Sequence, residues 1–572
     1  MKRSALPRRD TLRKMRRGRD LLFEALQAQG VGYVFGNPGT TELPILDGFT
    51  SHPSVQYVEA LHEDIAVGMA MGYARLARNL GVVNLHVAPG LAHGLGNLYS
   101  AWRARIPLLV TAGQQHTRLL IQEPILTADL VGMARPFTKW AYEVRSADEL
   151  PSVLQRAFKE ALAPPSGPVF LSLPADAMLA EVGDEVPPPR LTSQPAPATR
   201  GDDAEIARAA ARLVGAERPL IVAGDGVGLA DAWAEVAAIA ERLGAPVYTE
   251  ALSTVCNFPP THPHWAGTLP DTPEAMRQVF AEVDVALVCG FSSQAPVAIF
   301  DAGGPLVPWS VDVVAVHDNP WEIAKNGPIL AGILGDVRLN LGALLSALKA
   351  TSQPRGAGGG ANRRRAELGR QATERRAAWT DQANHARQQD SLTATAVAAA
   401  LAEVMPPNAI LADESISNRP PFLNLLNYQT PRSFWAGKSG GLGHSGGAAL
   451  GMRLAAPERP VVNVVGDGAF LYYPQVLWTA ANLRLRSTVF VVLNNASYRV
   501  LKIGLERMGG PWAGAQPPGL DIQNPCVDLA ALARSFGLQA ERLTRPDELR
   551  PAFEQALSAP GPVLLDCVLA AG

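Results

Sequence analysis

Oxygen-bearing side chains follow two neighbouring apolar stretches near the end of the 572-residue chain. The stretch VVGDGAF, residues 464–470, ends an apolar run at Asp467, and TVFVVLNNAS, residues 488–497, ends the next run at two asparagines. Both runs are typical of buried parallel strands, and the intervening YYPQVLWTAANLRL is typical of a helix. A right-handed crossover brings the carboxyl ends of two such strands to one edge of a sheet. We therefore expect Asp467 and Asn495 to lie close together.

This edge has the composition of a magnesium site that also binds a diphosphate. Asp467 can offer a carboxylate oxygen, Asn495 an amide oxygen and Ser497 a backbone carbonyl. Hard oxygen ligands of this kind suit Mg²⁺, which keeps some waters and commonly bridges to phosphate oxygens. The flanking Gly466 and Gly468 would let a diphosphate approach the backbone closely. Two ordinary polar turns are the alternative, and the joint occurrence of GDG and NN argues against it.

Two residues nearer the start of the chain could carry acid–base chemistry. Glu63 follows the apolar stretch VQYVEAL and opens a small-residue helix, EDIAVGMAMGYA, where its carboxyl group could exchange a proton. A carboxylate that only stabilises the start of this helix is the alternative. The neighbouring Glu59 and Asp64 are expected to be solvated. His86 ends the stretch GVVNLHV, and a lone histidine at a strand end is usually a structural hydrogen-bonding residue.

Strand and helix patterns alternate along the chain in three blocks, which predicts an α/β protein built on parallel sheets. The predicted domains span residues 20–190, 203–350 and 386–572. A Pro-rich passage separates the first two, and a linker at residues 351–385, Gly-rich and then highly charged, separates the last two. The first and third blocks have similar sizes, which suggests a site between two related domains with the middle one as a spacer.

Bulk composition excludes several classes of protein. The net charge is −2, so no overall field favours nucleic acid or an acidic membrane surface, and no apolar run is long enough for a membrane span. The four cysteines are far apart, which argues against a disulfide scaffold or a zinc site and favours a cytoplasmic location. Residues 1–19 include nine Lys or Arg and lack the apolar stretch of a signal peptide, so we expect a basic disordered tail.

A second GDG motif gives an internal comparison. The stretch AGDGVG, residues 223–228, follows the apolar PLIV and approaches a dinucleotide fingerprint, but its third glycine is not at the required spacing. A tight strand-to-helix turn without a ligand is the favoured interpretation, and a vestigial or regulatory nucleotide site is the alternative. A Rossmann dehydrogenase that binds NAD through this motif would leave the GDG–NN pair unexplained.

The GDG–NN pair resembles the thiamine diphosphate signature, in which NN follows GDG across one helix. Further motifs of the same kind are VFGNPGTTELP (34–44), LHED (61–64), NLHVAPG (84–90), VTAGQQ (110–115), RPFTKW (135–140) and GGLG (440–443). Together they resemble the thiamine-diphosphate-dependent 2-oxo-acid decarboxylase and acetohydroxyacid-synthase superfamily, and most of all the benzoylformate decarboxylases. The resemblance implies three doubly wound parallel-sheet domains: pyrimidine-binding, central and diphosphate-binding. It implies thiamine diphosphate and Mg²⁺, bound between the subunits of at least a homodimer, and a homotetramer is expected.

The resemblance also implies roles for individual residues. Glu63 matches the carboxyl group that hydrogen-bonds the pyrimidine ring and promotes ylid formation, and His86 matches an active-site histidine that orients substrate and moves protons. Thr40 matches a serine whose hydroxyl meets the substrate carboxylate, although Thr40 or Thr41 could instead cap a helix. Leu442 matches the apolar residue that bends the cofactor. The remaining cofactor and metal contacts are expected from Gly441, Glu414, Ser415, Ser417, Gly466, Gly468, Ala469, Asp467, Asn495 and Ser497.

The chain departs from the benzoylformate decarboxylase pattern in two places. Related enzymes supply a second active-site histidine from the middle domain, and this chain has no histidine between His264 and His317. Val500 and Gly504 stand where those enzymes have a small residue and an aromatic, which weakens the case for an aryl substrate. His444 is either a replacement acid or a residue that fills a helix start. His93 has no matching role and is expected on the following helix.

These observations predict a lyase that decarboxylates a 2-oxo acid. An enzyme that protonates its intermediate poorly can pass it to an aldehyde acceptor, so a carboligase of the acetohydroxyacid-synthase or benzaldehyde-lyase type is the alternative. A synthase of the first type would add flavin in the middle domain. A non-enzymatic protein that keeps the fold is less favoured, because Glu63 is retained. We expect small-molecule substrates and neither nucleic acid nor membrane as a partner.

Overall fold

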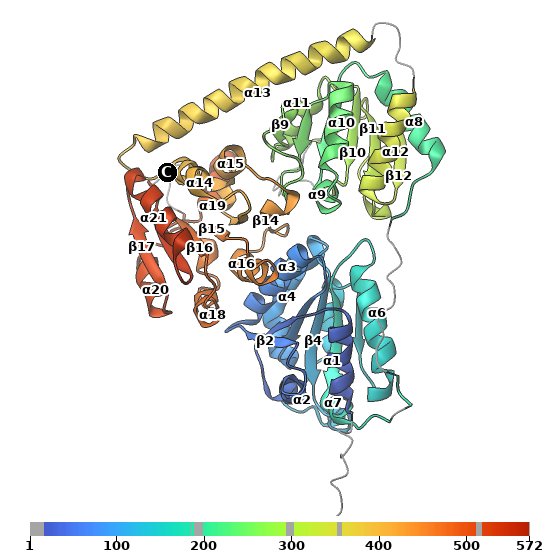
Figure 1. Cartoon of the computed structure of the whole chain (residues 1–572), viewed down its shortest axis with the longest axis vertical. Helices are drawn as coiled ribbons and strands as arrows, with labels where there is room; N and C mark the ends of the chain where they lie inside the picture. Colours follow the sequence, from blue (N-terminus) through green and yellow to red (C-terminus); the bar gives the residue numbers. More distant parts are fainter. Residues whose placement is uncertain are drawn as a thin grey trace, which may run out of the picture.

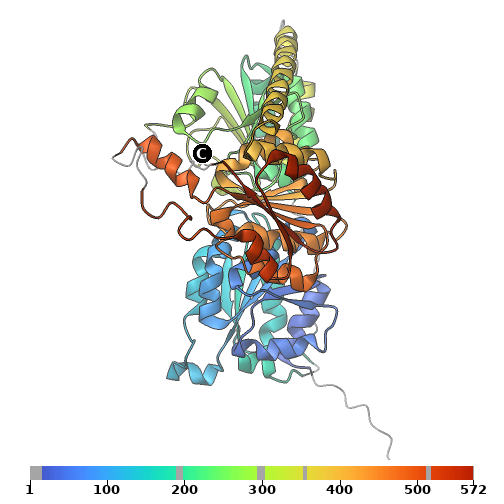
Figure 2. The ribbon, with the colours of Figure 1, turned by 90° about the vertical axis from the view of Figure 1, so that its left-hand side faces the viewer.

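Three α/β domains make up the chain (Figure 1). The computed structural model describes residues 16–183, 185–187, 198–292, 303–351, 357–510 and 517–570. Each domain holds one six-stranded sheet whose neighbouring strands all run parallel. In Figure 1 the green central domain lies above the blue N-terminal domain, and the orange-to-red C-terminal domain lies beside them; in Figure 2 the C-terminal domain is in front. The predicted three-domain architecture is confirmed. No helix in the described ranges is long and apolar enough to cross a membrane.

The N-terminal domain has helices on both faces of a sheet with the strand order β2-β1-β3-β4-β6-β5. Its elements are α1 (Gly18–Ala28), β1 (Tyr33–Gly36), α2 (Leu43–Phe49), β2 (Gln56–Glu59), α3 (Glu63–Ala77), β3 (Gly81–Leu85), α4 (Val87–Arg103), β4 (Leu108–Gln114), α5 (Leu130–Ala134), β5 (Trp140–Glu143), α6 (Leu150–Leu162), β6 (Val169–Pro174) and α7 (Ala175–Leu179). Along β4, Leu108 and Val110 pack with α3 and α4, whereas Leu109 packs with α1 and α6 on the other face. Because helices cover both faces of the sheet, side chains on both sides of β4 are buried, which is why the strand is apolar.

The start of α1 corrects the predicted tail. Residues 1–15 lie outside the described residues, but the prediction of disorder is wrong for residues 16–19. Helix α1 begins at Gly18, and Arg16 pairs with Glu24 at 2.6 Å. The positive charges of this segment are therefore partly neutralised by the helix that follows.

The central domain has the strand order β12-β11-β10-β7-β8-β9, which is the Rossmann order. Its elements are α8 (Asp203–Val214), β7 (Pro219–Ala223), α9 (Asp225–Leu229), α10 (Trp233–Leu243), β8 (Val247–Thr249), β9 (Trp265–Thr268), α11 (Pro273–Phe280), β10 (Val285–Cys289), β11 (Asp312–His317), β12 (Ala331–Leu334) and α12 (Val337–Ala350). Helices α8, α10 and α12 cover one face of the sheet, and α11 packs on the other.

The first GDG motif is an anchor between domains. Asp225 is buried, and its carboxylate accepts hydrogen bonds from the backbone N–H of Thr254 at 2.8 Å and its hydroxyl at 2.9 Å. Lys438 of the C-terminal domain pairs with Asp225 at 2.9 Å and also contacts Glu250. Because this carboxylate is committed to protein groups, the structure favours the tight-turn interpretation of AGDGVG.

The predicted linker at residues 351–385 is for the most part a helix. Helix α13 (Ala357–Arg387) spans the distance between the central and C-terminal domains, along the top of Figure 1. The expectation of a flexible Gly-rich segment is therefore wrong for residues 357–360. Arg370 pairs with Glu367 and Glu374, each at 2.6 Å, and Arg364 donates to the carbonyl of Leu243 at 2.6 Å. Ion pairs along the helix and contacts with the central domain outweigh the low helix propensity of glycine.

The C-terminal domain repeats the topology of the N-terminal domain, with the order β14-β13-β15-β16-β18-β17. Its elements are α14 (Ala394–Val404), β13 (Ile410–Glu414), α15 (Arg419–Leu425), β14 (Phe434–Ala436), α16 (His444–Ala455), β15 (Val461–Gly466), α17 (Asp467–Phe470), α18 (Val476–Leu483), β16 (Thr488–Asn494), α19 (Arg499–Met508), α20 (Leu529–Ser535), β17 (Gln539–Leu543), α21 (Pro546–Ser558) and β18 (Val563–Val568). Helices α16 and α18 pack on one face of this sheet, and α14 and α21 pack on the other. The identical strand order supports the predicted relation between the first and third blocks.

Helices α3 and α16 join the two related domains. A Cβ on Gly72 would overlap the carbonyl of Ala448, and one on Gly68 would lie 3.1 Å from the carbonyl oxygen of His444. A step of four residues along α3 corresponds to a step of four residues along α16 in the same direction, so the two helices run parallel. The N-terminal ends of α3 and α16 therefore lie at the same end of the pair, which places Glu63 on the same side as the loop before α16.

Candidate active site

The GDG and NN turns meet at the carboxyl edge of the C-terminal sheet, as the sequence predicts. Gly466 of β15 pairs in register with Leu493 of β16, and Asp467 follows as the first residue of α17. Asp467 is 4% exposed, and its Oδ1 accepts the N–H of Gly468 at 2.9 Å. Burial raises the pKa of the Asp467 carboxyl to about 6, although backbone N–H groups beside it, first that of Gly468, act to lower the pKa.

The buried carboxylate of Asp467 fits a cation site. Its Oδ2 is buried and has no hydrogen-bond partner among the described residues. A buried carboxylate oxygen without a partner is costly unless a proton or a cation compensates it. A Cβ built on Gly466 would find no atom within 4 Å, so there is open space beside this carboxylate for a phosphate group. These residues therefore fit Mg²⁺ together with a diphosphate.

The other predicted metal ligands shape the NN turn. Asn495 accepts the N–H of Ser497 through its side-chain oxygen at 3.1 Å, and the Ser497 hydroxyl donates to the carbonyl of Leu520 at 3.1 Å. Asn494 donates to the buried Asp566 at 2.9 Å. Sequence reasoning missed Asp566, because it lies on β18, which pairs with β16 but is distant in the chain. The turn is thus fixed before any ion binds.

Glu414 and Ser415, two of the predicted diphosphate contacts, hydrogen-bond to protein groups instead. The carboxylate of Glu414 accepts the N–H groups of Gly443 at 2.6 Å and Ser445 at 2.8 Å, so it caps α16. The hydroxyl of Ser415 is buried and donates to Asp413 at 2.5 Å. Neither side chain is available to a phosphate. The half-buried Ser417 keeps its place as a candidate hydroxyl, and Ala469 lies in the first turn after Asp467.

The GGLG loop leads into α16 at the junction of the two related domains. Leu442 is half-buried and packs against the core that the N-terminal and C-terminal domains share. His444 is 4% exposed, its Nδ1 lies 3.0 Å from the carbonyl of Gly441, and its ring packs edge-on against Trp435. His444 therefore fixes the shape of the loop at the helix start. Its burial argues against the alternative role of an acid that meets substrate.

His86 is held by a buried carboxylate that sequence reasoning missed. Its Nδ1 lies 2.7 Å from Oε2 of Glu42, a residue that is fully buried. The same carboxylate accepts the N–H groups of Gly113 at 2.8 Å and Gly39 at 3.1 Å, and the hydroxyl of Thr41 at 2.8 Å. A carboxylate at this distance fixes the proton on Nδ1 and leaves Nε2 free to face a substrate. A Glu three residues after a helix cap was the available sequence signal.

The turn before α2 brings Thr41, and not Thr40, against His86. The Thr41 hydroxyl lies 3.3 Å from Nδ1 of His86, whereas Thr40 is exposed at the start of the short helix Thr40–Glu42. A Cβ on Gly39 would overlap the ring of His86, so only glycine allows this approach. Neither threonine takes the cap position of the alternative interpretation, because Glu42 is the cap residue of α2 and Gly39 is that of the short helix before it. The exposed hydroxyl of Thr40 stays a predicted substrate contact.

Glu63 begins α3 and is almost buried. Its Oε1 accepts a hydrogen bond from Nδ2 of Asn37 at 3.3 Å, and its Oε2 lies 3.2 Å from Nδ1 of His93 on α4. Sequence reasoning had expected His93 only on this helix, and the contact with Glu63 depends on how α3 and α4 pack. A pair of polar side chains thus orients the carboxyl group of Glu63.

The expectation that Asp64 is solvated is wrong. Asp64 is 3% exposed, accepts the N–H of Asn97 at 3.0 Å and accepts the hydroxyl of Tyr473 at 2.6 Å. Burial raises the pKa of its carboxyl. Tyr473 belongs to the C-terminal domain, so this burial arises from domain packing. Glu59 is exposed, as expected.

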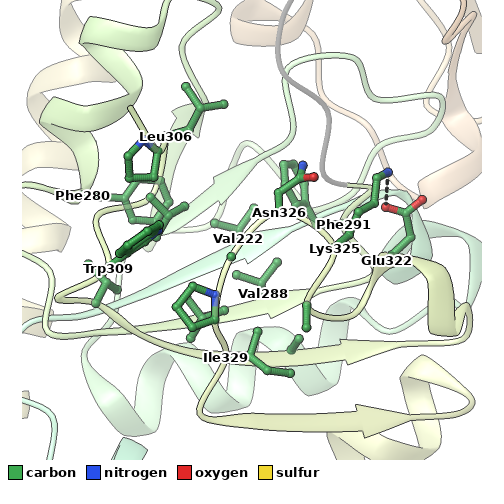
Figure 3. A pocket seen from close by; sticks show the side chains of 18 of the residues that line it. Val222, Phe280, Val288, Phe291, Leu306, Trp309, Glu322, Lys325, Asn326 and Ile329 are labelled. Carbon is green, nitrogen blue, oxygen red and sulfur yellow. Dashed lines mark hydrogen bonds and ion pairs between the residues drawn. The ribbon is translucent and has the colours of Figure 1, made fainter. Parts of the chain in front are cut away.

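A separate pocket lies in the central domain (Figure 3). Its volume is about 340 Å³, and its walls are mainly apolar, with Val222, Phe280, Phe291 and Trp309 among them. The ion pair between Lys325 and Glu322, at 3.1 Å, lies in its wall. All lining residues belong to the central domain, and none of them is a residue that the sequence predicts at the site.

Comparison with known proteins agrees with this geometry. Residues 16–131 match the thiamine pyrophosphate enzyme N-terminal TPP binding domain, residues 206–345 match the central domain, and residues 421–567 match the C-terminal TPP binding domain. The chain is also 33% identical to benzoylformate decarboxylase of Pseudomonas aeruginosa, over 95% of this chain and 97% of that protein. The chain belongs to the thiamine pyrophosphate enzyme family.

Other members of the thiamine pyrophosphate enzyme family are similar over the same length. The 4-hydroxybenzoylformate decarboxylase of Rhodococcus jostii RHA1 has a TM-score of 0.83 and 28% identity, over 97% of this chain and 100% of that chain. An acetolactate synthase large subunit of Haemophilus influenzae is 26% identical, over 95% of this chain and 92% of that protein. The predicted membership is confirmed, and the family contains both decarboxylases and carboligases. The thiamine-pyrophosphate-binding domains support thiamine diphosphate as the cofactor.

Proposed function

We propose that this enzyme decarboxylates a 2-oxo acid with thiamine diphosphate and Mg²⁺. The observation that carries the proposal is the buried, unpartnered oxygen of Asp467 at the edge where GDG meets NN. We assign Mg²⁺ to Asp467, Asn495 and the carbonyl of Ser497, with the diphosphate beside Gly466. When bound, thiamine diphosphate supplies a nucleophilic carbon and an electron sink for the loss of CO₂.

The chain's own residues would position the reactants and move protons. Glu63 would hydrogen-bond the pyrimidine ring, since a carboxylate has about four lone-pair directions and only two are used by Asn37 and His93. His86, with its tautomer fixed by Glu42, would present Nε2 to the substrate. Leu442 would support the bent cofactor, with Gly441 beside it, and the exposed Thr40 would donate to the substrate carboxylate.

Carboligation is the second candidate function. No histidine lies between His264 and His317, so the chain lacks the second active-site histidine expected from its relatives. Val500 on α19 is 45% exposed, and Gly504 has open space around it, so the aromatic residue expected there is absent. An intermediate that is protonated slowly lives long enough to meet an aldehyde. The similarity to acetolactate synthases agrees with this alternative.

A panel of 2-oxo acids tests the function. The purified enzyme is incubated with thiamine diphosphate and Mg²⁺, and CO₂, aldehydes and 2-hydroxy ketones are all quantified. CO₂ with free aldehyde supports decarboxylation, whereas CO₂ with a 2-hydroxy ketone supports carboligation. Absence of CO₂ from aryl, branched and short 2-oxo acids alike would refute the proposal. A visible spectrum of the same sample tests for flavin.

We further propose that the active unit is at least a homodimer, with a homotetramer as the expected form. The proposal follows from the resemblance, in which the N-terminal domain of one subunit faces the C-terminal domain of another. Light scattering combined with an activity measurement tests this assembly. An active monomer would contradict a site shared between two chains.

A further inference from the structure

Lys438 is a buried cation in the loop that carries Leu442. This loop, residues 437–443, joins β14 to α16 and contains the GGLG motif. Nζ of Lys438 lies 2.9 Å from the carboxylate of Asp225 and also contacts that of Glu250. The three residues are only 3–4% exposed within a single chain, so the approach of another subunit can only bury them further. Because an unpaired buried charge is costly, the three groups hold one another in place.

Both carboxylates belong to the central domain. Glu250 follows β8 and accepts the backbone N–H of Asp225 at 3.1 Å. Although burial acts to raise it, the ammonium of Lys438 holds the pKa of the Asp225 carboxyl below its ordinary value. Thr254, which hydrogen-bonds to Asp225, accepts the N–H of Ala436 at 3.2 Å through its own carbonyl. The first GDG turn therefore holds the end of β14 as well as the beginning of the loop.

Ser439, the next residue of the loop, is bonded to the N-terminal domain. Its hydroxyl oxygen lies 2.5 Å from that of the buried Ser100 on α4, and it accepts the N–H of Gly441 at 3.0 Å. Gly440 has a φ of 75°, and a Cβ built on it would find no atom within 4 Å. A glycine in open space has wide conformational freedom, so the path of the loop here depends on its anchors.

The two ends of the loop are anchored by different parts of the chain. The end at α16 is anchored within the C-terminal domain, where Glu414 accepts the N–H of Gly443 at 2.6 Å. The beginning is anchored by the central domain through Lys438 and by the N-terminal domain through Ser439. Leu442 lies between these two sets of anchors, so its position depends on how the three domains are arranged.

We propose that Lys438 is a positioning residue, which fixes the loop of Leu442 against the central domain so that Leu442 can support the bent cofactor. This inference rests on the proposed function, in which Leu442 has that role toward thiamine diphosphate. The ammonium of Lys438 is enclosed by carboxylates of the central domain, so it acts through the loop and not on the cofactor. The first GDG turn then serves as the support of the cofactor loop.

Three variants separate positioning from a simple attachment of one domain to another. Lys438→Met keeps the length of the side chain but leaves two buried carboxylates unpaired, so it should lose stability. The triple variant Lys438→Met/Asp225→Asn/Glu250→Gln removes those charges, so it should regain stability without regaining the anchor. The matched control is Arg432→Met, which deletes an ion pair with Asp231 (2.9 Å) between the same two domains but outside the loop. Thermal unfolding compares their stabilities.

Amide hydrogen exchange of residues 439–443 in the cofactor-free protein tests the anchor directly. Exchange of this segment should be faster by about tenfold or more in Lys438→Met and in the triple variant, the factor that corresponds to loss of one hydrogen bond to a charged group. Arg432→Met should exchange like the parent in this segment. Parental protection of the segment in the triple variant would refute the anchor, even if Lys438→Met does not fold.

Hydrogen–deuterium exchange at the thiazolium C2 of the bound cofactor tests the consequence. It should slow by about 10²-fold in Lys438→Met and in the triple variant, the loss typical of a misplacement by about 1 Å. It should stay at the parental rate in Arg432→Met. Calorimetric titration with thiamine diphosphate and Mg²⁺ gives the affinity of each variant, so that the rates are compared at saturation.

Failure of this inference is distinguishable from failure of the proposed function. If the parent enzyme neither binds thiamine diphosphate nor exchanges its C2 proton, the proposed function fails and the positioning role fails with it. If the parent binds and exchanges, and the triple variant exchanges C2 at the parental rate, the function stands and the positioning role is refuted. Equal slowing in Arg432→Met would also refute it, because any lost contact between these domains would then have the same effect.

Discussion

Replacement of Glu42 by glutamine should impair catalysis through the tautomer of His86. In the parent, Oε1 of Glu42 accepts two backbone N–H groups, from Gly113 at 2.8 Å and Val87 at 3.4 Å, and Oε2 accepts one, from Gly39 at 3.1 Å, besides facing Nδ1 of His86. Glutamine keeps only one acceptor oxygen. Its NH₂ group must therefore face one of these two sets of donors.

Counting the unpaired donors decides which way the glutamine side chain turns. With NH₂ toward Gly113, two buried backbone N–H groups lose their acceptor. With NH₂ toward His86, only the N–H of Gly39 is lost, because an imidazole can move its proton to Nε2 and accept at Nδ1. Each orphaned buried donor costs about 1–3 kcal/mol, so the second orientation is preferred by a similar amount. In this orientation the proton of His86 lies on Nε2, the nitrogen that the parent leaves unprotonated to face the substrate.

The expected result is a protein that folds but reacts slowly. Stability should fall by about 1–3 kcal/mol, and kcat should fall by about 10²- to 10⁴-fold, the usual contribution of an acid–base group. Affinity for thiamine diphosphate should not change. The measurements are CO₂ release across pH, thermal unfolding and calorimetry. Glu143→Gln is the control, because Glu143 accepts from Ser172 at 2.9 Å on the same sheet and takes no part in the site.

A Glu42→Gln variant that loses stability but keeps the parental kcat and pH profile would refute this reasoning. It would mean that the amide oxygen faces His86, or that the tautomer of His86 does not govern the rate.

Three further predictions concern the metal, pH and domain packing. Asp467→Ala should weaken the Mg²⁺-dependent binding of thiamine diphosphate by more than about 100-fold, the loss found when a residue that only supports a metal ligand is replaced. The reason is that no carboxylate then holds the ion that links the diphosphate to this edge. Parental affinity in calorimetry would contradict the assignment of Asp467 as a metal ligand. Burial raises the pKa of Glu250 from 4.5 to about 7, so the folded chain retains a proton that the unfolded chain loses, and its stability falls as pH rises through this window. Glu250→Gln should therefore unfold at the parental urea concentration at about pH 4, below the unfolded pKa, but prove more stable than the parent at pH 8, by up to about 3 kcal/mol; equal midpoints at both pH values would refute this. Gly72→Ala should lower stability by about 1–3 kcal/mol, because its Cβ overlaps the carbonyl of Ala448, whereas Gly369→Ala on α13 has open space and should not; a thermal melt compares the two.

The parts of the site that sequence could predict are those set by local structure. GDG and NN follow consecutive parallel strands joined by a helical crossover, so the right-handed crossover alone brings Asp467 to the NN turn. Glu63 opens a helix because small apolar residues follow it directly. The strand patterns predicted three parallel sheets, since only a strand buried on both faces is apolar at every position.

Contacts between distant segments could not be predicted from the sequence. Asp64 is buried because Tyr473, more than 400 residues away, packs over it. Residues 357–360 form a helix despite their glycines, because α13 is anchored by Arg364 to the central domain. Each of these outcomes depends on which domain faces which, and that depends on the whole set of interdomain contacts.

The amino-acid sequence by itself determined the kind of chemistry: hard oxygen ligands beside glycines, an acid at a helix start and a histidine at a strand end. Only the tertiary structure decided which groups support them. It placed Glu42 behind His86, His93 beside Glu63 and Glu414 under the GGLG loop. The physical reason is that a hydrogen bond requires two atoms within about 3 Å, and residue spacing fixes that distance within one element but not between elements brought together by packing.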